Sequence, residues 1–387
     1  MSPTAVVLSL CQFLYMAVIA INLAFNSLIA QRLAPSSSLA TLPYLFMMGT
    51  TAALVLYLPK FFDRFGYRKM FVVGAASGTT GGVLASAALQ AHSFWVFCLA
   101  GAFVGLFQAT AMYYRYAAAD AVADTRKSSA IAWVLNGGIL SALLSKYVAN
   151  GTLHLLTEEY LGSYIALTLL ALLVVPILVV APLPARSQAR TTDPQQPAPI
   201  DGTALQAILF CAMGYLVMAL IMLASPLAMH GCGFHASDSA SVIQWHLLGM
   251  FAPSMLTGKL IARLGAKPVA FIGIAILALG CALAMSDQSL SGFHFALAIV
   301  GVGWNLMYLG GSTLVTLLPN PRLRSRVQSL NEFTTFSVTT VIAGATGWLF
   351  ALASWQGVLV IGVGCLLAVG LALSVLHRRT GQAAGPA

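Results

Sequence analysis

Charged residues are scarce in this sequence. Only 7% of its 387 residues are Asp, Glu, Lys or Arg, whereas 59% are hydrophobic. A soluble globular protein is excluded, because such a chain could not cover its surface with polar groups. The sequence also offers no nucleophile beside a base and no phosphate-binding loop in a suitable context, so an enzyme is not expected. The cysteines give no disulfide framework, since only Cys232 falls in a predicted outer loop.

Long apolar segments make up most of the chain. Each has about the twenty residues that a helix needs to cross a bilayer. Because lipid cannot satisfy backbone polar groups, these segments must be helices. The sequence therefore predicts an all-α membrane protein with about 12 transmembrane helices, near residues 5–30, 38–58, 70–91, 94–116, 129–150, 161–182, 204–229, 239–260, 268–286, 291–318, 328–352 and 355–377.

The basic residues lie mainly on one side of these predicted helices. Of nineteen Lys and Arg residues, only Arg32 falls clearly on the opposite side. The positive-inside rule then places both termini in the cytoplasm. This distribution accounts for the net charge of +9 without a nucleic-acid partner. The expected surroundings are the lipid bilayer.

A short basic turn occurs twice in the chain. Arg64 and Gly66 in the first copy correspond to Arg263 and Gly265 in the second, and both pairs are 199 positions apart (263 − 64 and 265 − 66). Since this offset is about half of the chain, we interpret the protein as a duplicated six-helix unit. The halves are 1–184 and 204–387, joined by a cytoplasmic linker at 185–203 that lacks apolar periodicity.

This turn resembles the signature of the major facilitator superfamily, Gly-x-x-x-Asp-Arg-x-Gly-x-Arg-Lys. The chain departs from it at Pro59, which stands in place of the first glycine, and at Ala262, which replaces the acid in the second copy. The resemblance implies a fold of two six-helix halves and transport by alternating access.

Soft metal-ligand side chains occur four residues apart on two neighbouring predicted helices. Met218 and Met222 lie on the first helix, and His246 and Met250 lie on the second. Residues i and i+4 share a helix face, and both pairs begin roughly 10 Å below the outer surface. A methionine pair alone is more often packing. Thioether and imidazole ligands without carboxylate nevertheless favour Cu(I), so these four residues are the predicted metal site.

Further candidates lie along the same helices or inside others. Secondary residues of a metal path are Met229, His230, Cys232 and His235 at the outer mouth and Cys211 toward the cytoplasm. Polar groups that are instead candidates to line a central cavity are Lys146, Trp304 and Asn305. Lys146 is also close enough to the outer end to reach water. Glu332 fits a helix cap or an ion pair, with a proton relay as the alternative.

The metal-ligand pairs, together with the runs MHGCGFH, VIQWHLLGMFAPS and GWNLMYLGG, resemble the CcoA-type bacterial copper importers. That resemblance implies an inner-membrane importer that supplies copper for cytochrome cbb3 oxidase biogenesis, with a copper chaperone or exporter as a further partner. It also implies copper binding by Met218, Met222, His246 and Met250. Two alternatives stay open: a proton-coupled transporter of small organic molecules with Lys146 and Trp304 in its cavity, and a copper receptor that does not transport.

Overall fold

The computed structural model describes residues 2–123, 126–184 and 200–382, and every regular element in these residues is a helix. The first half contains α1 (Pro3–Leu33), the short η1 (Ser37–Leu39), α2 (Leu42–Val55), α3 (Leu58–Gln90), α4 (Phe94–Ala111), α5 (Tyr114–Asp120), α6 (Lys127–Leu153) and α7 (Leu161–Val180). The second half contains α8 (Gly202–Gly231), α9 (Ala236–Phe251), α10 (Ser254–Leu264), α11 (Ala266–Ser286), α12 (Leu290–Thr316) and α13 (Pro321–Gln382).

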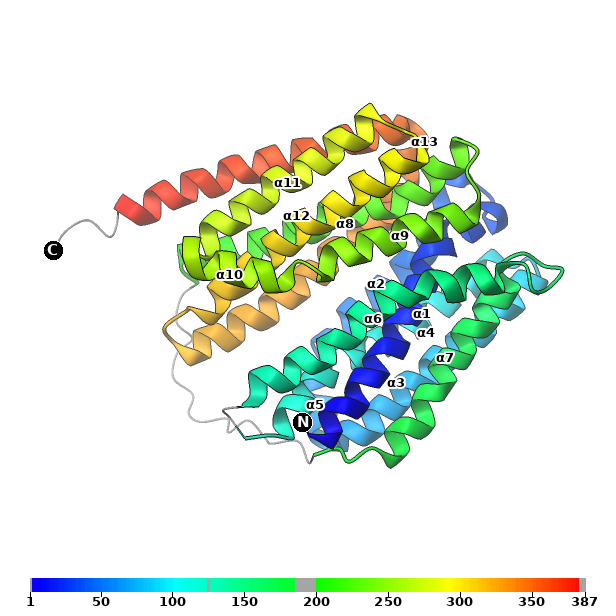
Figure 1. Ribbon diagram of the computed structural model, residues 1–387, viewed down its shortest axis with the longest axis horizontal. Coiled ribbons are helices and arrows are strands. Elements are labelled where there is room, and N and C mark those ends of the chain that lie inside the picture. The colour runs from blue at the N-terminus through cyan, green and yellow to red at the C-terminus, as the bar shows by residue number, and fades with distance from the viewer. Residues whose placement is uncertain (1, 124–125, 185–199, 383–387) are drawn as a thin grey trace.

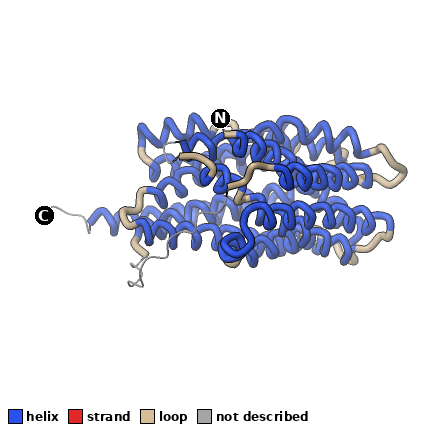
Figure 2. Tube along the Cα trace, turned by 90° about the horizontal axis from the view of Figure 1, so that it is seen from below, coloured by secondary structure: helices blue, strands red, loops and turns tan. Residues whose placement is uncertain are grey.

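The helices form two bundles that lie side by side. In Figure 1, α1 to α7 occupy the lower bundle and α8 to α13 the upper one. Figure 2, viewed at right angles, shows that the helices run along one common direction. This parallel arrangement is the one expected of helices that cross a bilayer together.

Ten described helices are long and apolar enough to cross a membrane. One of them, Arg326–Leu376, bends at Ser354 and therefore makes two crossings. The segments α9 and α10 are individually shorter but follow each other with a break at Ala252 and Pro253, and together they make one more. Ten plus one plus one gives the twelve crossings that the apolar segments predict. The predicted crossing near 239–260 is therefore present, but its helix is divided at this break.

The two basic turns have the same backbone conformation. Gly66 has φ 76° and ψ 166°, and Gly265 has φ 89° and ψ 161°. Only glycine adopts this region without strain, which explains why each turn carries one. Arg68, two residues after the first glycine, donates from Nη2 to the carbonyl of Ala181 at the end of α7 (2.9 Å). Basic side chains can satisfy the free carbonyl groups at a helix C-terminus in this way. Most of the predicted linker, 185–199, lies outside the described residues.

The two halves contact each other closely near the predicted outer surface. Asn150 of α6 donates from Nδ2 to the carbonyl of Ser237 of α9 (3.1 Å), and Gln244 donates from Nε2 to the carbonyl of Leu143 (2.6 Å). On another side of the interface, the backbone N–H of Gly347 in α13 donates to Thr41 Oγ1, just before α2 (2.9 Å). Two hydrogen bonds between α6 and α9 and one between α13 and the start of α2 therefore hold the outer ends together.

Candidate substrate site

Helix α12 is packed against both helices that carry the predicted metal ligands. On the α8 side, Gly214 faces Met307 and Trp304, and one turn deeper the thiol of Cys211 donates to the carbonyl of Tyr308 (3.7 Å). The two helices are antiparallel: α8 runs toward the outer surface and α12 runs toward the inner surface. Residues later in α8 therefore lie beside residues earlier in α12. Met218, about 6 Å beyond Gly214, is therefore close to the level of Gly301.

The contacts of α9 with α12 define a second register. His246 is hydrogen-bonded through Nδ1 to the carbonyl of Leu297 (2.9 Å), and Gly301 lies against the backbone of His246 and Met250. One turn deeper, Asn305 donates from Nδ2 to the carbonyl of Met250 (2.7 Å). His246 is thus close to the level of Leu297, and Met250 is one turn deeper.

These two registers put the ligand pairs at matching levels. Met222 and His246 both lie near the level of Leu297, and Met218 and Met250 near that of Gly301. Leu297 is seven residues from the start of α12, about 10 Å below the outer end. All four side chains are buried, with 0% exposure for His246 and at most 8% for the others. Coordination of one ion by all four stays a prediction.

The imidazole of His246 has one satisfied nitrogen and one unsatisfied nitrogen. The carbonyl of Leu297 can only accept, so Nδ1 carries the proton and Nε2 of a neutral ring is a bare acceptor. Nε2 is buried and has no hydrogen-bond partner in the described structure. Metal-binding histidines characteristically have this arrangement. Among the described residues, no three His, Cys, Asp or Glu side chains gather as a metal site, so a metal here would depend on methionine.

The secondary candidates are spread from the outer surface inward. Met229 is fully buried and accepts a hydrogen bond at its sulfur from Ser239 (3.8 Å). Cys232 and His235 are exposed: the Cys232 thiol donates to Gln288 Oε1 (3.5 Å), and His235 caps α9. Cys211 lies at the opposite, inner end, bonded to α12. The path residues are therefore not gathered at one point.

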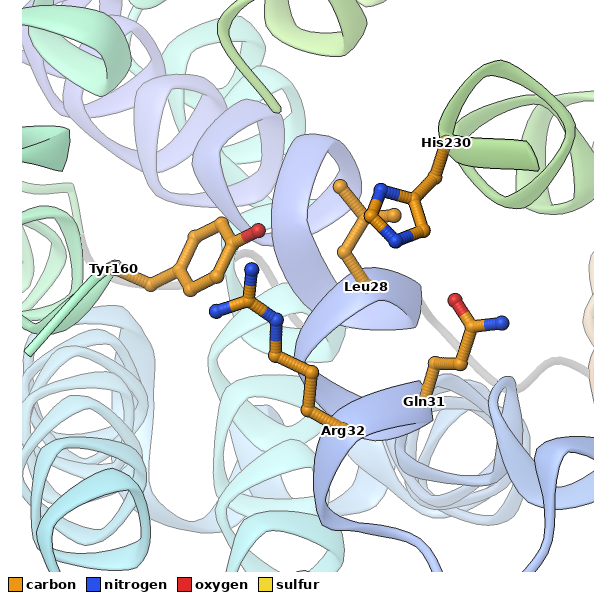
Figure 3. A pocket seen from close by; sticks show the side chains of 5 residues that line it. All are labelled: Leu28, Gln31, Arg32, Tyr160 and His230. Atoms are coloured by element: carbon orange, nitrogen blue, oxygen red, sulfur yellow. The ribbon is translucent and has the colours of Figure 1, made fainter. Parts of the chain in front are cut away.

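His230 lines a small outer pocket of about 100 Å³ between the two halves. Its imidazole points toward Leu28 and Gln31 of α1 (Figure 3). On the other side of the pocket, Arg32 lies over the ring of Tyr160 and pairs with Glu159 (2.7 Å). Because Glu159 neutralises Arg32, this pair adds no net charge that would attract a metal cation to His230.

Two of the alternative cavity residues have structural contacts. Lys146 donates from Nζ to Ser241 Oγ across the interface (3.5 Å), and Ser241 in turn bonds to His294 (3.0 Å). Asn305 uses its amide to join α9, α10 and α12, with Thr257 donating to Oδ1 (2.6 Å). Both side chains thus bridge helices, Lys146 between halves and Asn305 within one.

Trp304 belongs to an aromatic cluster directly below the methionine level. Its ring stacks on Tyr308 with 5.0 Å between centroids, and Tyr215 of α8 meets both rings edge-on. Trp304 Nε1 is buried without a partner. Arg115 of the first half places a positive charge near Tyr215 and Tyr308. A cation of the first half is therefore near the aromatic cluster of the second half.

Arg115 is bound to a carboxylate of the opposite half. Its Nη2 lies 3.4 Å from Glu332 Oε1 of α13, and Tyr116 donates to the same oxygen (3.1 Å). Asp120, the acid nearest to Arg115 in the sequence, accepts a hydrogen bond from Tyr67 (2.7 Å). Glu332 is thus in an ion pair, the simpler of its two predicted roles. This pair joins the halves on the inner side, opposite the outer contacts.

Sequence reasoning missed Tyr215 and the partner of Arg115. Tyr215 lies three residues before Met218 on the same helical face, a signal that was present beside the methionine pair. The Arg115–Glu332 pair is 217 positions apart and depends on how the halves pack. The sequence contains no local pattern that indicates it.

Comparisons with known proteins agree with this architecture. The family model described as Major Facilitator Superfamily matches residues 203–387. The chain is 32% identical over 377 residues to the riboflavin transporter RfnT of Brucella anthropi, covering 95% of this chain and 94% of that protein. It is also 26% identical to the uncharacterized MFS-type transporter YddS of Bacillus subtilis, over 83% of this chain and 78% of that one.

Solved structures are similar in fold at low sequence identity. The nucleoside transporter NupG gives a TM-score of 0.75 at 14% identity, covering 96% of this chain and 99% of that one. A bacterial homolog of the lysosomal transporter Spinster, in an inward-facing and occupied conformation, gives 0.73 at 14% identity and covers 98% of each chain. At such identities the likeness concerns the fold.

Proposed function

This chain belongs to the major facilitator superfamily of transporters, and from this premise we propose that it carries a small organic molecule with a flat aromatic ring system across the bacterial inner membrane. The relative that is 32% identical along almost the whole chain is named for riboflavin, whose three fused rings are of this kind. Transport rather than catalysis is the role of the family.

The observation that carries the proposal is the aromatic cluster at the interface of the halves. Trp304 and Tyr308 are stacked, and Tyr215 and Tyr308 are partly exposed although they lie deep between helices. Stacking on such rings stabilises a flat aromatic ligand by roughly 1 kcal/mol per pair. Trp304 Nε1 and the Arg115 guanidinium supply donors that can fix its orientation.

The neighbouring ion pair suits a transport cycle. Arg115 and Glu332 belong to opposite halves, so the halves cannot separate on the inner side without breaking their contact. A polar substrate group that replaces one partner would weaken this contact. Binding would then be coupled to the rocking motion of the halves. We propose proton coupling as the driving force, with Glu332 as the carboxylate that carries the proton.

The test is uptake of labelled riboflavin by bacteria that can neither synthesise nor import it. Expression of the chain should give uptake that excess unlabelled riboflavin abolishes. Trp304→Leu should reduce it at least tenfold, because it removes the stacking surface and a donor. Trp348→Leu is the matched control, since Trp348 is an exposed ring on α13. Equal uptake by the Trp304 variant and its control would refute the site.

A second candidate substrate is copper, as the resemblance to CcoA-type importers implies. The observation that favours it is His246, whose Nδ1 is held by Leu297 while Nε2 is buried without a partner. The methionine pairs at matching levels supply thioethers, which suit Cu(I). Under this proposal, copper passes the His246 level and leaves toward Cys211, feeding cytochrome cbb3 oxidase assembly.

Radioactive copper uptake in the same cells separates the two candidates. If copper is the cargo, His246→Gln and Met218→Leu should abolish copper accumulation, and Trp304→Leu should leave it mostly intact. Purified protein in liposomes that binds copper without flux would instead indicate a receptor. Wild-type cells that accumulate no more copper than cells without the protein would refute the copper proposal.

A further inference from the structure

An apolar groove lies between α10 and α12 in the inner half of the second bundle. Its volume is about 390 Å³, and its walls include Leu256 and Leu260 of α10 and Val302 and Leu306 of α12. Leu256 is 69% exposed. The groove begins beside the α9–α10 break at Pro253 and continues toward the inner surface. It is separate from the aromatic cluster and from the predicted metal site.

The groove opens on the side of α12 that faces away from the other half. Val302 lies two residues before Trp304, and Leu306 lies two residues before Tyr308; Trp304 and Tyr308 belong to the aromatic cluster. At 100° per residue, each pair is turned by about 200° around the helix. Since the cluster faces α8 and the first half, the groove faces the outside of the bundle. In a membrane that side is occupied by lipid.

Two basic side chains stand at the edge of the groove. Lys259 and Arg263 are four residues apart on α10, so they project from one face, and both are exposed. Neither forms an ion pair within the described part of the chain. Arg263 lies two residues before the inner turn at Gly265, which is the level of lipid headgroups, and Lys259 is about 6 Å deeper. A lysine at that depth extends its ammonium toward the headgroups.

We propose that this groove binds one anionic phospholipid of the cytoplasmic leaflet. Its phosphate would lie between Lys259 and Arg263, and one acyl chain would lie along Leu256, Leu260, Val302 and Leu306. Both parts of the ligand are matched, the negative headgroup by unpaired cations and the hydrocarbon by apolar walls. A free phosphate would use only the edge, and an uncharged lipid only the walls.

Such a lipid would act where the helix is interrupted. The inner segment α10 is joined to α9 only through Ala252 and Pro253 and is held to α12 through Asn305. An acyl chain that contacts both α10 and α12 adds packing between them on the lipid-facing side of the bundle. The bound lipid should therefore stabilise this arrangement of α10.

Native mass spectrometry of the purified full chain counts bound lipids directly. We would titrate palmitoyl-oleoyl phosphatidylglycerol, with phosphatidylcholine of the same chains and inorganic phosphate as comparison ligands. The double variant K259Q/R263Q should bind the first phosphatidylglycerol roughly twenty-five-fold more weakly, because each basic residue near an anionic lipid contributes about fivefold. Phosphatidylcholine should bind wild type and this variant alike.

The duplicated turn offers a matched control. Lys60 and Arg64 are also exposed, four residues apart, and precede Gly66 as Lys259 and Arg263 precede Gly265. K60Q/R64Q should retain wild-type affinity for the first phosphatidylglycerol. V302F, which fills the groove at unchanged charge, should weaken it. Equal loss in both double variants, unchanged binding by V302F, or displacement of the lipid by inorganic phosphate would each overturn the proposal.

Discussion

Asn305→Ala should destabilise the second half of the protein more than any other change to a single buried amide. Asn305 is 1% exposed and makes three hydrogen bonds: to the Met250 carbonyl (2.7 Å), to Ser254 Oγ (2.9 Å) and from Thr257 (2.6 Å). Ser254 keeps a second bond to the Phe251 carbonyl (2.8 Å). The substitution therefore removes three hydrogen bonds and leaves the Met250 carbonyl and the Thr257 hydroxyl poorly satisfied.

The expected loss can be bracketed from these contacts. Hydrogen bonds between membrane helices contribute on average about 0.6 kcal/mol, so three give roughly 2 kcal/mol as the lower value. Leaving two buried groups unsatisfied costs about 1–3 kcal/mol each, so the upper value is about 6 kcal/mol. We expect about 2–4 kcal/mol. Unfolding of the purified protein in mixed micelles, followed by tryptophan fluorescence, measures this difference.

Gln206 of α8 provides the control for this prediction. It is also buried, at 2% exposure, but neither of its amide atoms has a hydrogen-bond partner in the described structure. Gln206→Met removes an unsatisfied amide of similar size and should leave stability unchanged or raise it. If Asn305→Ala unfolds at the same denaturant concentration as wild type, the reasoning about the α9–α10 break is wrong.

Three further changes test other contacts. Ser354 has φ 57° and ψ −173°, a region almost restricted to glycine, so Ser354→Gly should stabilise by about 1 kcal/mol in the same unfolding assay. Glu332→Ala leaves the half-buried Arg115 unpaired and should lower the melting temperature more than the double variant R115A/E332A does; equal effects would deny the coupling. Gly301→Leu places a side chain against the backbone at His246, so the variant should not elute as a monodisperse protein on size-exclusion chromatography. Gly364→Leu has open space at its position and should elute as wild type does.

The membrane-spanning segments could be predicted well because apolar length alone decides them. The predicted boundary between 352 and 355 coincides with the bend at Ser354 inside α13. The α9–α10 break could not be placed in the same way, although Pro253 was visible in the sequence. A proline interrupts a helix only where the freed backbone groups find other partners. Here Asn305, 52 positions away (305 − 253), supplies one of them.

The sequence could define shared faces on single helices, but it could not define the contacts between the two halves. The spacing of Met218 and Met222, and of His246 and Met250, defines shared faces that follow from helix geometry. By contrast, Asn305 was expected to line a cavity, and its amide instead braces three helices. The meeting of Arg115 with the aromatic rings of the second half depends on packing between bundles, which no local pattern encodes.

The central claim is that the aromatic cluster binds the transported molecule, and counterflow tests it most directly. Purified protein would be placed in liposomes loaded with unlabelled riboflavin, and labelled riboflavin added outside. The account predicts a transient accumulation of label for wild type and for Trp348→Leu, and its loss for Trp304→Leu. Liposomes that show no riboflavin counterflow with the wild-type protein, while admitting copper in a manner that depends on His246, would contradict it.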